Sequence, residues 1–191
     1  MNRWFFALKH AWGQRKVLKS FLTERNKQIY SLSEITPARL DAAQVAILVL
    51  DFDGVLAHHD AKEPNDEALK WLRNLSMNIG EQRIALLTNK PKRNRLEFFN
   101  THFPSIHIVS GVRKKPYPDG LAEVANYKGV APHRVLLLDD RLLTGMLATC
   151  LSYSQGWYFR KPYSNYWKNP IRESFFSFLR GFERLWISMI G

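Results

Sequence analysis

The chain has one cysteine and no long hydrophobic run, and these absences narrow what it can be. Cys150 cannot form a disulfide within the chain, and one thiol cannot build a cysteine metal cluster. No apolar run approaches the roughly 20 residues that a membrane-spanning helix needs. Residues 1–22 mix aromatic and basic side chains instead of forming the core of a signal peptide. Internal repeats and low-complexity segments are also missing, so we expect one globular domain that is not inserted in a membrane.

Acidic residues are scarce at both ends of the chain. Residues 1–40 carry eight Lys/Arg and two Asp/Glu, and residues 151–191 carry six and two. The stretch between them is nearly balanced, so the net charge of +11 belongs to the ends. Basic ends attract anionic surfaces, and both membrane lipid and nucleic acid qualify. Because no nucleic-acid-binding module accompanies them, an anionic membrane surface is the partner we expect.

The middle of the chain alternates between strand-like and helix-like patterns. Continuous aliphatic runs occupy 45–51 (VAILVLD), 83–88 (RIALLT) and 134–139 (RVLLLD), and 106–109 is a shorter candidate strand. Helical patterns lie between and after them, at 65–77, 91–103, 119–127 and 141–148. This alternation predicts an α/β fold: a Rossmann-like three-layer sandwich with a parallel central sheet.

Two of these strand-like runs end in a carboxylate, Asp51 or Asp139, and a third ends in Thr88. Ligands bind outside the carboxyl ends of the strands in such sheets, so these polar residues are the first site candidates. In DFDGVL, at 51–56, Asp51 is suited to attack phosphorus, and Asp53 is suited to protonate a leaving oxygen and then activate water. Asp140 is a third oxygen donor for Mg²⁺ beside Asp51 and the backbone carbonyl of Asp53, with Asp139 as a further candidate ligand.

A phosphoryl group also needs a cation and hydrogen-bond donors around its oxygens. Lys115, in KKPYPDG, is the natural cation. Thr88, in LLTNK, offers a hydroxyl and a backbone N–H, and Asn89 lies beside it. We therefore predict phosphate binding by Thr88, Asn89 and Lys115.

Four segments resemble the four motifs of the haloacid dehalogenase superfamily and occur in the same order along the chain. They are DFDGV, the Thr of LLTN, the Lys of KKP and the Asp pair of LLLDDRLLTG. Over roughly residues 30–187 the chain is similar to the phosphatidylglycerophosphate phosphatase-like subfamily. That likeness rests on SLSEITPARL at 31–40, the third motif, DDRLLTG at 139–145 and the aromatic, basic C-terminal stretch. The resemblance implies a nucleophile at Asp51, acid/base catalysis by Asp53, phosphate contacts from Thr88 and Lys115, and Mg²⁺ held by Asp51, Asp53 and Asp140.

Two motifs depart from the subfamily's pattern. Its fourth motif usually reads Gly-Asp-x-x-x-Thr-Asp, but here Asp139 stands at the first position and Gly145 at the last. Its first motif commonly has Asn-Thr where this chain has Gly54 and Val55, a change that concerns the substrate more than the chemistry.

The spacing of the motifs leaves no room for an inserted cap domain. Only 34 residues separate Asp53 from Thr88, and 26 separate Thr88 from Lys115. We therefore expect an open site that suits a large or surface-embedded substrate.

Both ends of the chain are candidates for membrane contact. We divide it into a basic, aromatic, helical extension (1–40), a catalytic core (41–168) and an amphipathic helix (169–191). The apolar residues of that helix recur at helical spacing, and they suit either a lipid interface or packing on the domain. They are Ile171, Phe175, Phe178, Leu179, Phe182, Leu185, Trp186 and Met189. Residues 1–40 suit membrane contact, partner binding or packing. Arg172, Arg180 and Arg184 are expected at the margin of the C-terminal apolar face or opposite it.

Two further segments lie near the predicted site. His58 and His59 are expected in a loop at the site entrance, and the basic run of Lys90, Lys92, Arg93 and Arg95 either holds an anionic headgroup or forms a solvated helix face.

The sequence thus predicts a Mg²⁺-dependent phosphomonoesterase that works through an aspartyl-phosphate. The expected substrate is an anionic lipid headgroup such as phosphatidylglycerophosphate, reached from a peripheral position on the inner, cytoplasmic face of a membrane. One alternative is a soluble phosphatase of sugar or nucleotide phosphates. Another is a catalytically weak protein that binds lipid or nucleic acid.

Overall fold

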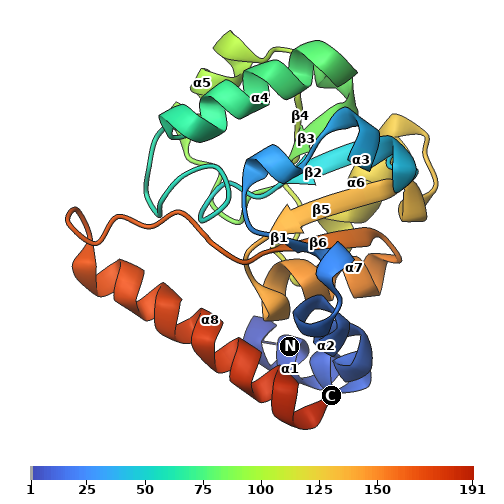
Figure 1. Cartoon of the computed structure of the whole chain (residues 1–191), viewed down its shortest axis with the longest axis vertical. Coiled ribbons are helices and arrows are strands. Elements are labelled where there is room, and N and C mark those ends of the chain that lie inside the picture. Colours follow the sequence, from blue (N-terminus) through green and yellow to red (C-terminus); the bar gives the residue numbers. More distant parts are fainter. Residues whose placement is uncertain (1) are drawn as a thin grey trace.

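A parallel sheet of six strands lies at the centre of the protein, in a computed structural model that describes residues 2–191 (Figure 1). The strand order is β1-β6-β5-β2-β3-β4. The strands are β1 (Gln28–Ile29), β2 (Ile47–Leu50), β3 (Ile84–Leu86), β4 (His107–Ile108), β5 (Val135–Asp139) and β6 (Gln155–Phe159). Neighbouring strands of this sheet pair in parallel, which confirms the predicted α/β fold.

Both faces of the sheet are buried because its strands are apolar at consecutive positions. Leu48 and Leu50 of β2 point into one core cluster, and Ile47 and Val49 point into a second cluster on the other face. Alternate residues of β5 divide between the clusters in the same way. Helices therefore have to cover both faces, which gives the three layers of the sandwich.

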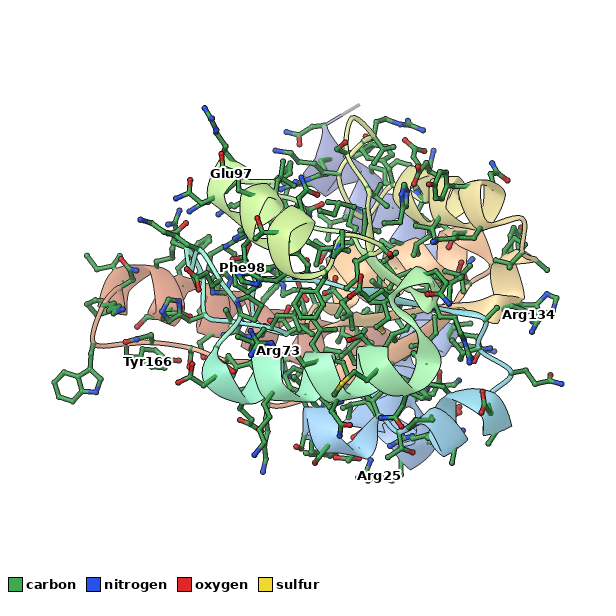
Figure 2. The ribbon with its side chains drawn as sticks, turned by 90° about the horizontal axis from the view of Figure 1, so that it is seen from above. Arg25, Arg73, Glu97, Phe98, Arg134 and Tyr166 are labelled. Carbon is green, nitrogen blue, oxygen red and sulfur yellow. The ribbon has the colours of Figure 1, made fainter. Side chains whose placement is uncertain are left out.

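The helices fall into groups around the sheet (Figures 1 and 2). The α-helices are α1 (Arg3–Gly13), α2 (Arg15–Thr23), α3 (Pro37–Ala42), α4 (Asp66–Ile79), α5 (Arg93–His102), α6 (Asp119–Lys128), α7 (Leu147–Ser152) and α8 (Pro170–Ile190). Short helical turns are η1 (Arg25–Lys27), η2 (Leu32–Glu34), η3 (Glu81–Arg83), η4 (Pro132–Arg134) and the π-helical η5 (Leu142–Met146). Residues of α3, α4 and α5 pack on one face, and those of α6 and α7 pack on the other. Figure 2 looks onto the first layer, with Arg73 marking α4 and Glu97 and Phe98 marking α5.

The terminal helices form a third cluster next to η5 and α7. Leu18 and Phe21 of α2 pack there with Met146 of η5, Tyr158 of β6 and Ile187 of α8. In Figure 1, α1 and α2 lie beside the C-terminal end of α8, on the side of the molecule away from α4. Over residues 2–191, none of the helices is both long enough and apolar enough to cross a membrane.

Two strands lie outside the runs that the sequence singled out. β6 pairs with β5, and β1 pairs with β6 at the edge of the sheet. β1 comes from residues 1–40, so this segment contributes to the sheet as well as supplying α1 and α2. The helix expected at 141–148 is instead the π-helical turn η5 followed by α7, which runs on to Ser152.

Candidate active site

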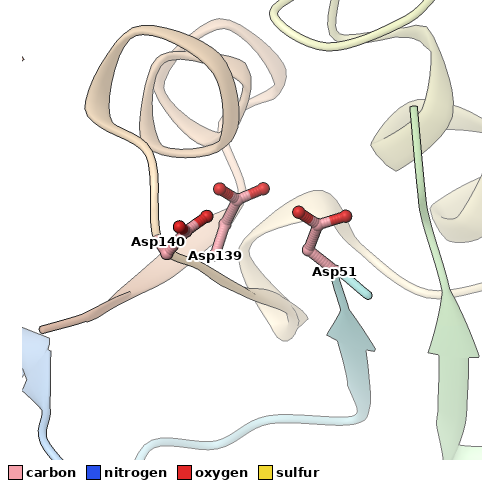
Figure 3. A group of neighbouring side chains, drawn as sticks. All are labelled: Asp51, Asp139 and Asp140. Atoms are coloured by element: carbon pink, nitrogen blue, oxygen red, sulfur yellow. The ribbon is translucent and has the colours of Figure 1, made fainter. Parts of the chain in front are cut away.

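The carboxyl ends of β2 and β5 bring three aspartates together (Figure 3). Leu50 pairs with Leu138 in the parallel register, so Asp51 and Asp139 extend neighbouring strands at the same edge. One carboxylate oxygen from each of Asp51, Asp139 and Asp140 lies within 4.8 Å of the others. After β2 the chain forms β3 on one side of β2, and it later forms β5 on the other side. The strand order therefore reverses at β2, and parallel sheets bind ligands at such a switch point.

Lys115 is the cation of this cluster. Its side chain is 2% exposed, and its Nζ lies 3.0 Å from Oδ1 of Asp51 and also contacts Oδ2 of Asp139. Burial alone would lower the pKa of Lys115, but the carboxylates of Asp139 and Asp51 outweigh it and hold that pKa above the ordinary value. Asn89 fixes the backbone here, since its Oδ1 accepts a hydrogen bond from the Lys115 amide at 2.8 Å. The lysine is therefore held charged against Asp51.

The electrostatics of the aspartates suit a divalent cation. The pKa of Asp51 is raised to about 8, mainly by burial; Lys115 lowers this pKa, and the neighbouring Asp139, Asp53 and Asp140 contribute to raising it. Burial and then Asp139 raise the pKa of Asp140 to about 6. A hard cation bound by carboxylate oxygens relieves this crowding, and these are the ligands that Mg²⁺ prefers. The donor set therefore fits Mg²⁺.

A sharp turn after Asp53 keeps the chain close to this cluster. Gly54 has φ +87°, a backbone conformation that favours glycine, and a Cβ at this position would lie 2.5 Å from Oδ2 of Asp140. Gly54 is thus required for two reasons: its backbone forms the turn, and the absence of a side chain leaves room for the carboxylate of Asp140.

Asp53 is held by an arginine from α5. The guanidinium of Arg95 donates to Oδ1 of Asp53 at 2.6 Å and to Oδ2 at 3.1 Å, and it also donates to the carbonyl oxygen of Ala61 at 2.8 Å. Arg95 is fully buried, and its guanidinium carbon lies 3.9 Å from the centre of the Phe52 ring. Both expectations for Arg95, a headgroup contact and a solvated helix face, are wrong, because this arginine is the buried partner of Asp53.

Thr88 follows β3 as predicted and is buried. Its Oγ1 accepts a hydrogen bond from the Lys90 amide at 3.2 Å. Asn89 and Lys90 line the cavity that contains Asp51. Thr88 is not among the described residues that line this cavity.

The C-terminal helix α8 turns a charged face toward this site. Arg180 donates to Oδ2 of Asp140 at 2.8 Å, and Oε1 of Glu183 accepts from Nε of Arg141 at 2.9 Å. Arg180 and Glu183 are both buried, so the expectation that Arg180 lies at a margin or on an outer face is wrong. An isolated buried charge is costly, and the strand-end residues supply the partners that make this burial possible.

A third buried charge of α8 reaches the loop after the first motif. Glu173 accepts from the amide and from Nδ1 of His59, each at 3.1 Å. The His59 ring stacks on Phe176 at 3.8 Å between centroids. Burial lowers the pKa of His59, against the raising effect of Glu173. His59 does line the site cavity, as expected of this loop, but as a buried anchor for α8.

Phe175, Phe178 and Phe182 of α8 face outward, whereas Phe176 and Trp186 are half-buried. Six of the eight apolar residues predicted to share a face are exposed, so packing of that whole face on the domain is wrong; the other two, Leu179 and Trp186, are half-buried. The exposed set is Ile171, Phe175, Phe178, Phe182, Leu185 and Met189. We call these six residues the outer face of α8.

The terminal helices also line the site cavity. This cavity of about 280 Å³ contains Asp51, Asp53, Lys115 and Asp140 in its wall. Arg3 and Trp4 of α1 and Phe175, Phe176 and Leu179 of α8 complete it. Over residues 2–191 the sheet domain carries no inserted cap, and α1 and α8 supply part of the wall of the site.

Comparisons with protein-family models and with curated protein sequences find no significant match. The chain is also similar to several solved structures. A protein of Lactobacillus delbrueckii subsp. bulgaricus to which phosphoglycolate phosphatase activity is attributed shares 24% identity, with a TM-score of 0.40, over 51% of this chain and 44% of that one. A HAD family hydrolase of Deinococcus radiodurans, solved with phosphate and sodium, shares 18% identity, with a TM-score of 0.37, over 60% and 80%.

An uncharacterized protein of Corynebacterium glutamicum is also similar, at 20% identity and a TM-score of 0.48, over 72% of this chain and 96% of that one. Because these identities and scores are low, an activity for this chain has to come from the side chains of its own site.

Proposed function

We propose that the protein is a Mg²⁺-dependent phosphomonoesterase that forms an aspartyl-phosphate on Asp51. The observation that carries this proposal is the buried cluster at the ends of β2 and β5. In it, Asp51 contacts Lys115, and its carboxylate lies close enough to those of Asp139 and Asp140 for the three to bind one metal ion. A carboxylate nucleophile, a fixed cation and a set of hard oxygen donors are what phosphoryl transfer to a protein side chain requires.

The reaction has two steps. A carboxylate oxygen of Asp51 forms a bond to phosphorus while the bond to the leaving oxygen breaks, and Asp53 gives that oxygen a proton. Asp53 then takes a proton from water, whose oxygen attacks phosphorus and releases Asp51 and inorganic phosphate. Arg95 orients Asp53 through its two hydrogen bonds, and Lys115 offsets negative charge beside Asp51. Asp51, Asp140 and the backbone carbonyl of Asp53 would hold Mg²⁺, with Asp139 as a further candidate ligand, and the bound ion would neutralise charge on the phosphoryl oxygens.

We further propose that the substrate is a phosphorylated lipid headgroup, with phosphatidylglycerophosphate as the leading candidate. The outer face of α8 supports this, because it presents large apolar side chains to solvent instead of burying them. The exposed Trp4, Phe5, Leu8 and Trp12 of α1 extend the apolar surface. A helix with one strongly apolar exposed face, in a chain of net charge +11, suits the surface of an anionic bilayer.

The site cavity and this apolar surface share residues. Trp4 and Phe175 line the cavity and are nevertheless 46% and 54% exposed. Arg3, Lys90 and Lys114 supply positive charge to the same wall. A headgroup phosphate that enters past Trp4 and Phe175 therefore leaves its acyl chains on the apolar side of the protein.

A soluble phosphatase is the alternative that the size of the cavity favours. A volume of about 280 Å³ is at the lower limit of small-molecule sites and fits a small phosphate ester. The two functions differ in the substrate, while the chemistry on Asp51 is the same.

The first experiment measures Mg²⁺-dependent phosphate release from phosphatidylglycerophosphate in mixed micelles, with soluble phosphate esters in parallel and Asp51→Asn as the control. Activity on the lipid that is lost in Asp51→Asn supports both proposals. Asp51-dependent activity on soluble esters alone keeps the chemistry and refutes the lipid substrate. Binding to vesicles without phosphate release under any divalent metal would refute the enzyme and favour a lipid-binding protein.

A second experiment tests the surface separately from the chemistry. Phe178→Ser with Leu185→Ser removes two outer-face residues that do not line the cavity, and we expect it to reduce sedimentation with anionic phospholipid vesicles at least tenfold. Met77→Ser is the matched control, because Met77 is 79% exposed on α4, on the opposite side of the molecule from α8 (Figure 1). If both variants lose vesicle sedimentation equally, or if neither variant loses it, membrane contact through α8 is refuted.

A further inference from the structure

The two carboxylate oxygens of Asp140 have different surroundings. Oδ2 accepts a hydrogen bond from Nη1 of Arg180 at 2.8 Å. Within residues 2–191 no hydrogen bond reaches Oδ1, and Asp140 lines the site cavity. There is no spare room on the side of Gly54, since a Cβ there would lie 2.5 Å from Oδ2 and 3.2 Å from Oδ1. One oxygen of Asp140 is thus held by Arg180, and the other is left for a ligand.

Arg180 has little of the freedom of a surface arginine. Its side chain is 3% exposed, and it comes from a part of α8 that is fixed to the end of β5. Glu183, three residues further along the helix, accepts hydrogen bonds from Nε of Arg141 and from the amide of Leu142, each at 2.9 Å. Leu179, the residue before Arg180, lines the cavity. The guanidinium therefore reaches Asp140 from a helix segment that is itself held in place.

We infer that Arg180 is a positioning residue for the metal site: by holding Oδ2 of Asp140, it turns Oδ1 toward the place where Asp51 would also bind Mg²⁺. This inference rests on the proposed function in its choice of cation. Carboxylates that bind metal ions are themselves hydrogen-bonded, and losing such a partner costs about 10- to 100-fold in metal affinity or activity.

The charge of Arg180 acts in the opposite direction. A cation beside the site repels Mg²⁺, so an arginine that only competes with the metal would weaken its binding, and removing that arginine would strengthen it. An arginine that orients Asp140 strengthens metal binding, and removing it weakens that binding. The sign of the change in affinity therefore distinguishes the two roles.

The test measures the rise in Tm with MgCl₂ concentration at pH 8 for variants of the full chain, which gives a Kd for Mg²⁺. Each rise starts from the variant's own Tm without metal, so a loss of stability is not counted as a loss of affinity. Arg180→Met removes the hydrogen bond and keeps most of the volume, and we expect its Kd to be about 10- to 100-fold higher. Arg180→Lys keeps a charged donor and is expected to recover at least half of that change on a logarithmic scale. If Arg180→Met does not fold, Arg180→Gln replaces it, with the same direction expected.

Two further variants separate the orientation of Asp140 from the attachment of α8. Arg184→Met removes a half-buried arginine one turn further along, which donates to the Tyr158 hydroxyl at 3.1 Å. Its Kd is expected to stay within about threefold of the unmodified protein, because it contacts no candidate metal ligand. Glu183→Ala loosens the same helix but keeps the Arg180 side chain, so we expect a smaller rise in Kd than in Arg180→Met. An unchanged or lower Kd in Arg180→Met, or an equal rise in Glu183→Ala, would overturn the inference.

Phosphate release separates this inference from the proposed function. If the unmodified protein binds Mg²⁺ but hydrolyses no phosphate ester, the proposed phosphatase fails, and the Kd values still decide the role of Arg180. If the unmodified protein shows no rise in Tm with MgCl₂, both are refuted.

Discussion

Glu183 is the residue of α8 whose removal tests most directly how that helix is attached. Its Oε1 accepts from Nε of Arg141 at 2.9 Å and contacts Nη2 as well. Its Oε2 accepts from the amides of Leu142 at 2.9 Å and Leu143 at 3.4 Å, the first residues of the π-helical turn η5. All of these groups are buried, so water cannot easily replace the carboxylate. Glu183→Ala therefore leaves a buried guanidinium and two amides without their acceptor.

The expected loss is large for a single substitution. Removing one partner of a buried ion pair costs about 3–5 kcal/mol, because the remaining charge stays desolvated. For a chain of this length each kcal/mol corresponds to about 2–4 °C, so the Tm should fall by about 6–20 °C. Urea unfolding followed by circular dichroism measures the free energy directly. Glu183→Gln keeps the shape and loses the charge, and should lie between the alanine variant and the unmodified protein.

Glu97→Ala is the matched control. Glu97 pairs with Arg93 at 2.7 Å on α5, but both side chains are largely exposed (Figure 2). A surface pair of this kind contributes about 0.3–0.5 kcal/mol. A loss below about 1 kcal/mol in Glu183→Ala, or equal losses at the two sites, would refute the attachment of α8 through buried charge.

Three further outcomes are expected. Arg95→Met should lower kcat about 10- to 100-fold through misplacement of Asp53, whereas Arg93→Met on the same helix should not; equal steady-state rates would contradict this. Burial raises the pKa of Cys150 to about 11, so iodoacetamide at pH 8 should modify it at least tenfold more slowly in the folded protein than in urea, and equal rates by mass spectrometry would argue against burial. Because the raised pKa of Asp51 favours its protonated form in the folded state, this group's contribution to stability should fall as pH rises from about 4 to 8. Mg²⁺ needs the ionised form, so the rise in Tm with MgCl₂ should be larger at pH 8 than at pH 6, and Asp51→Asn should reduce that difference.

The strand-end residues of the site were predictable from the sequence. A strand buried on both faces has to be apolar at every position, so a continuous aliphatic run marks both the strand and the point where it stops. Asp51 and Asp139 terminate such runs, and the parallel register then places them side by side. Lys115 comes from a loop, and its position depended on the resemblance and not on periodicity. Fold class and the acidic cluster therefore followed from local sequence.

The orientation of α8 was not predictable in the same way. Helical periodicity shows that two faces of a helix differ, and the apolar face normally packs on the core. In α8 the charged face is inward instead, because Glu173, Arg180 and Glu183 have buried partners there. Glu173, Arg180 and Glu183 recur at spacings of seven and three, so they share a face, and this was the available signal. Their partners lie more than 35 residues away in the sequence, so the ion pairs become visible only in three dimensions.

β6 and Arg95 were missed for related reasons. In β6, Trp157, Tyr158 and Phe159 look like a surface aromatic tract, yet the strand buries all three between the sheet's covering layers. Arg95 lies among basic residues that are solvated, and only its hydrogen bonds to Asp53 distinguish it. A local pattern does not reveal a long-range partner for a charge.

The charges at the ends of β2 and β5 make the binding of a divalent cation and the binding of phosphate depend on each other. Three carboxylates face two cations, Lys115 and Arg180, which leaves one excess negative charge when all are ionised. A divalent cation reverses that sign, and a phosphate dianion reverses it again. Two ligands of opposite charge in one buried place must raise each other's affinity by the same factor. Before a cation binds, the carboxylate cluster itself therefore opposes the binding of phosphate. Once both ligands are bound, the loss of one weakens the binding of the other.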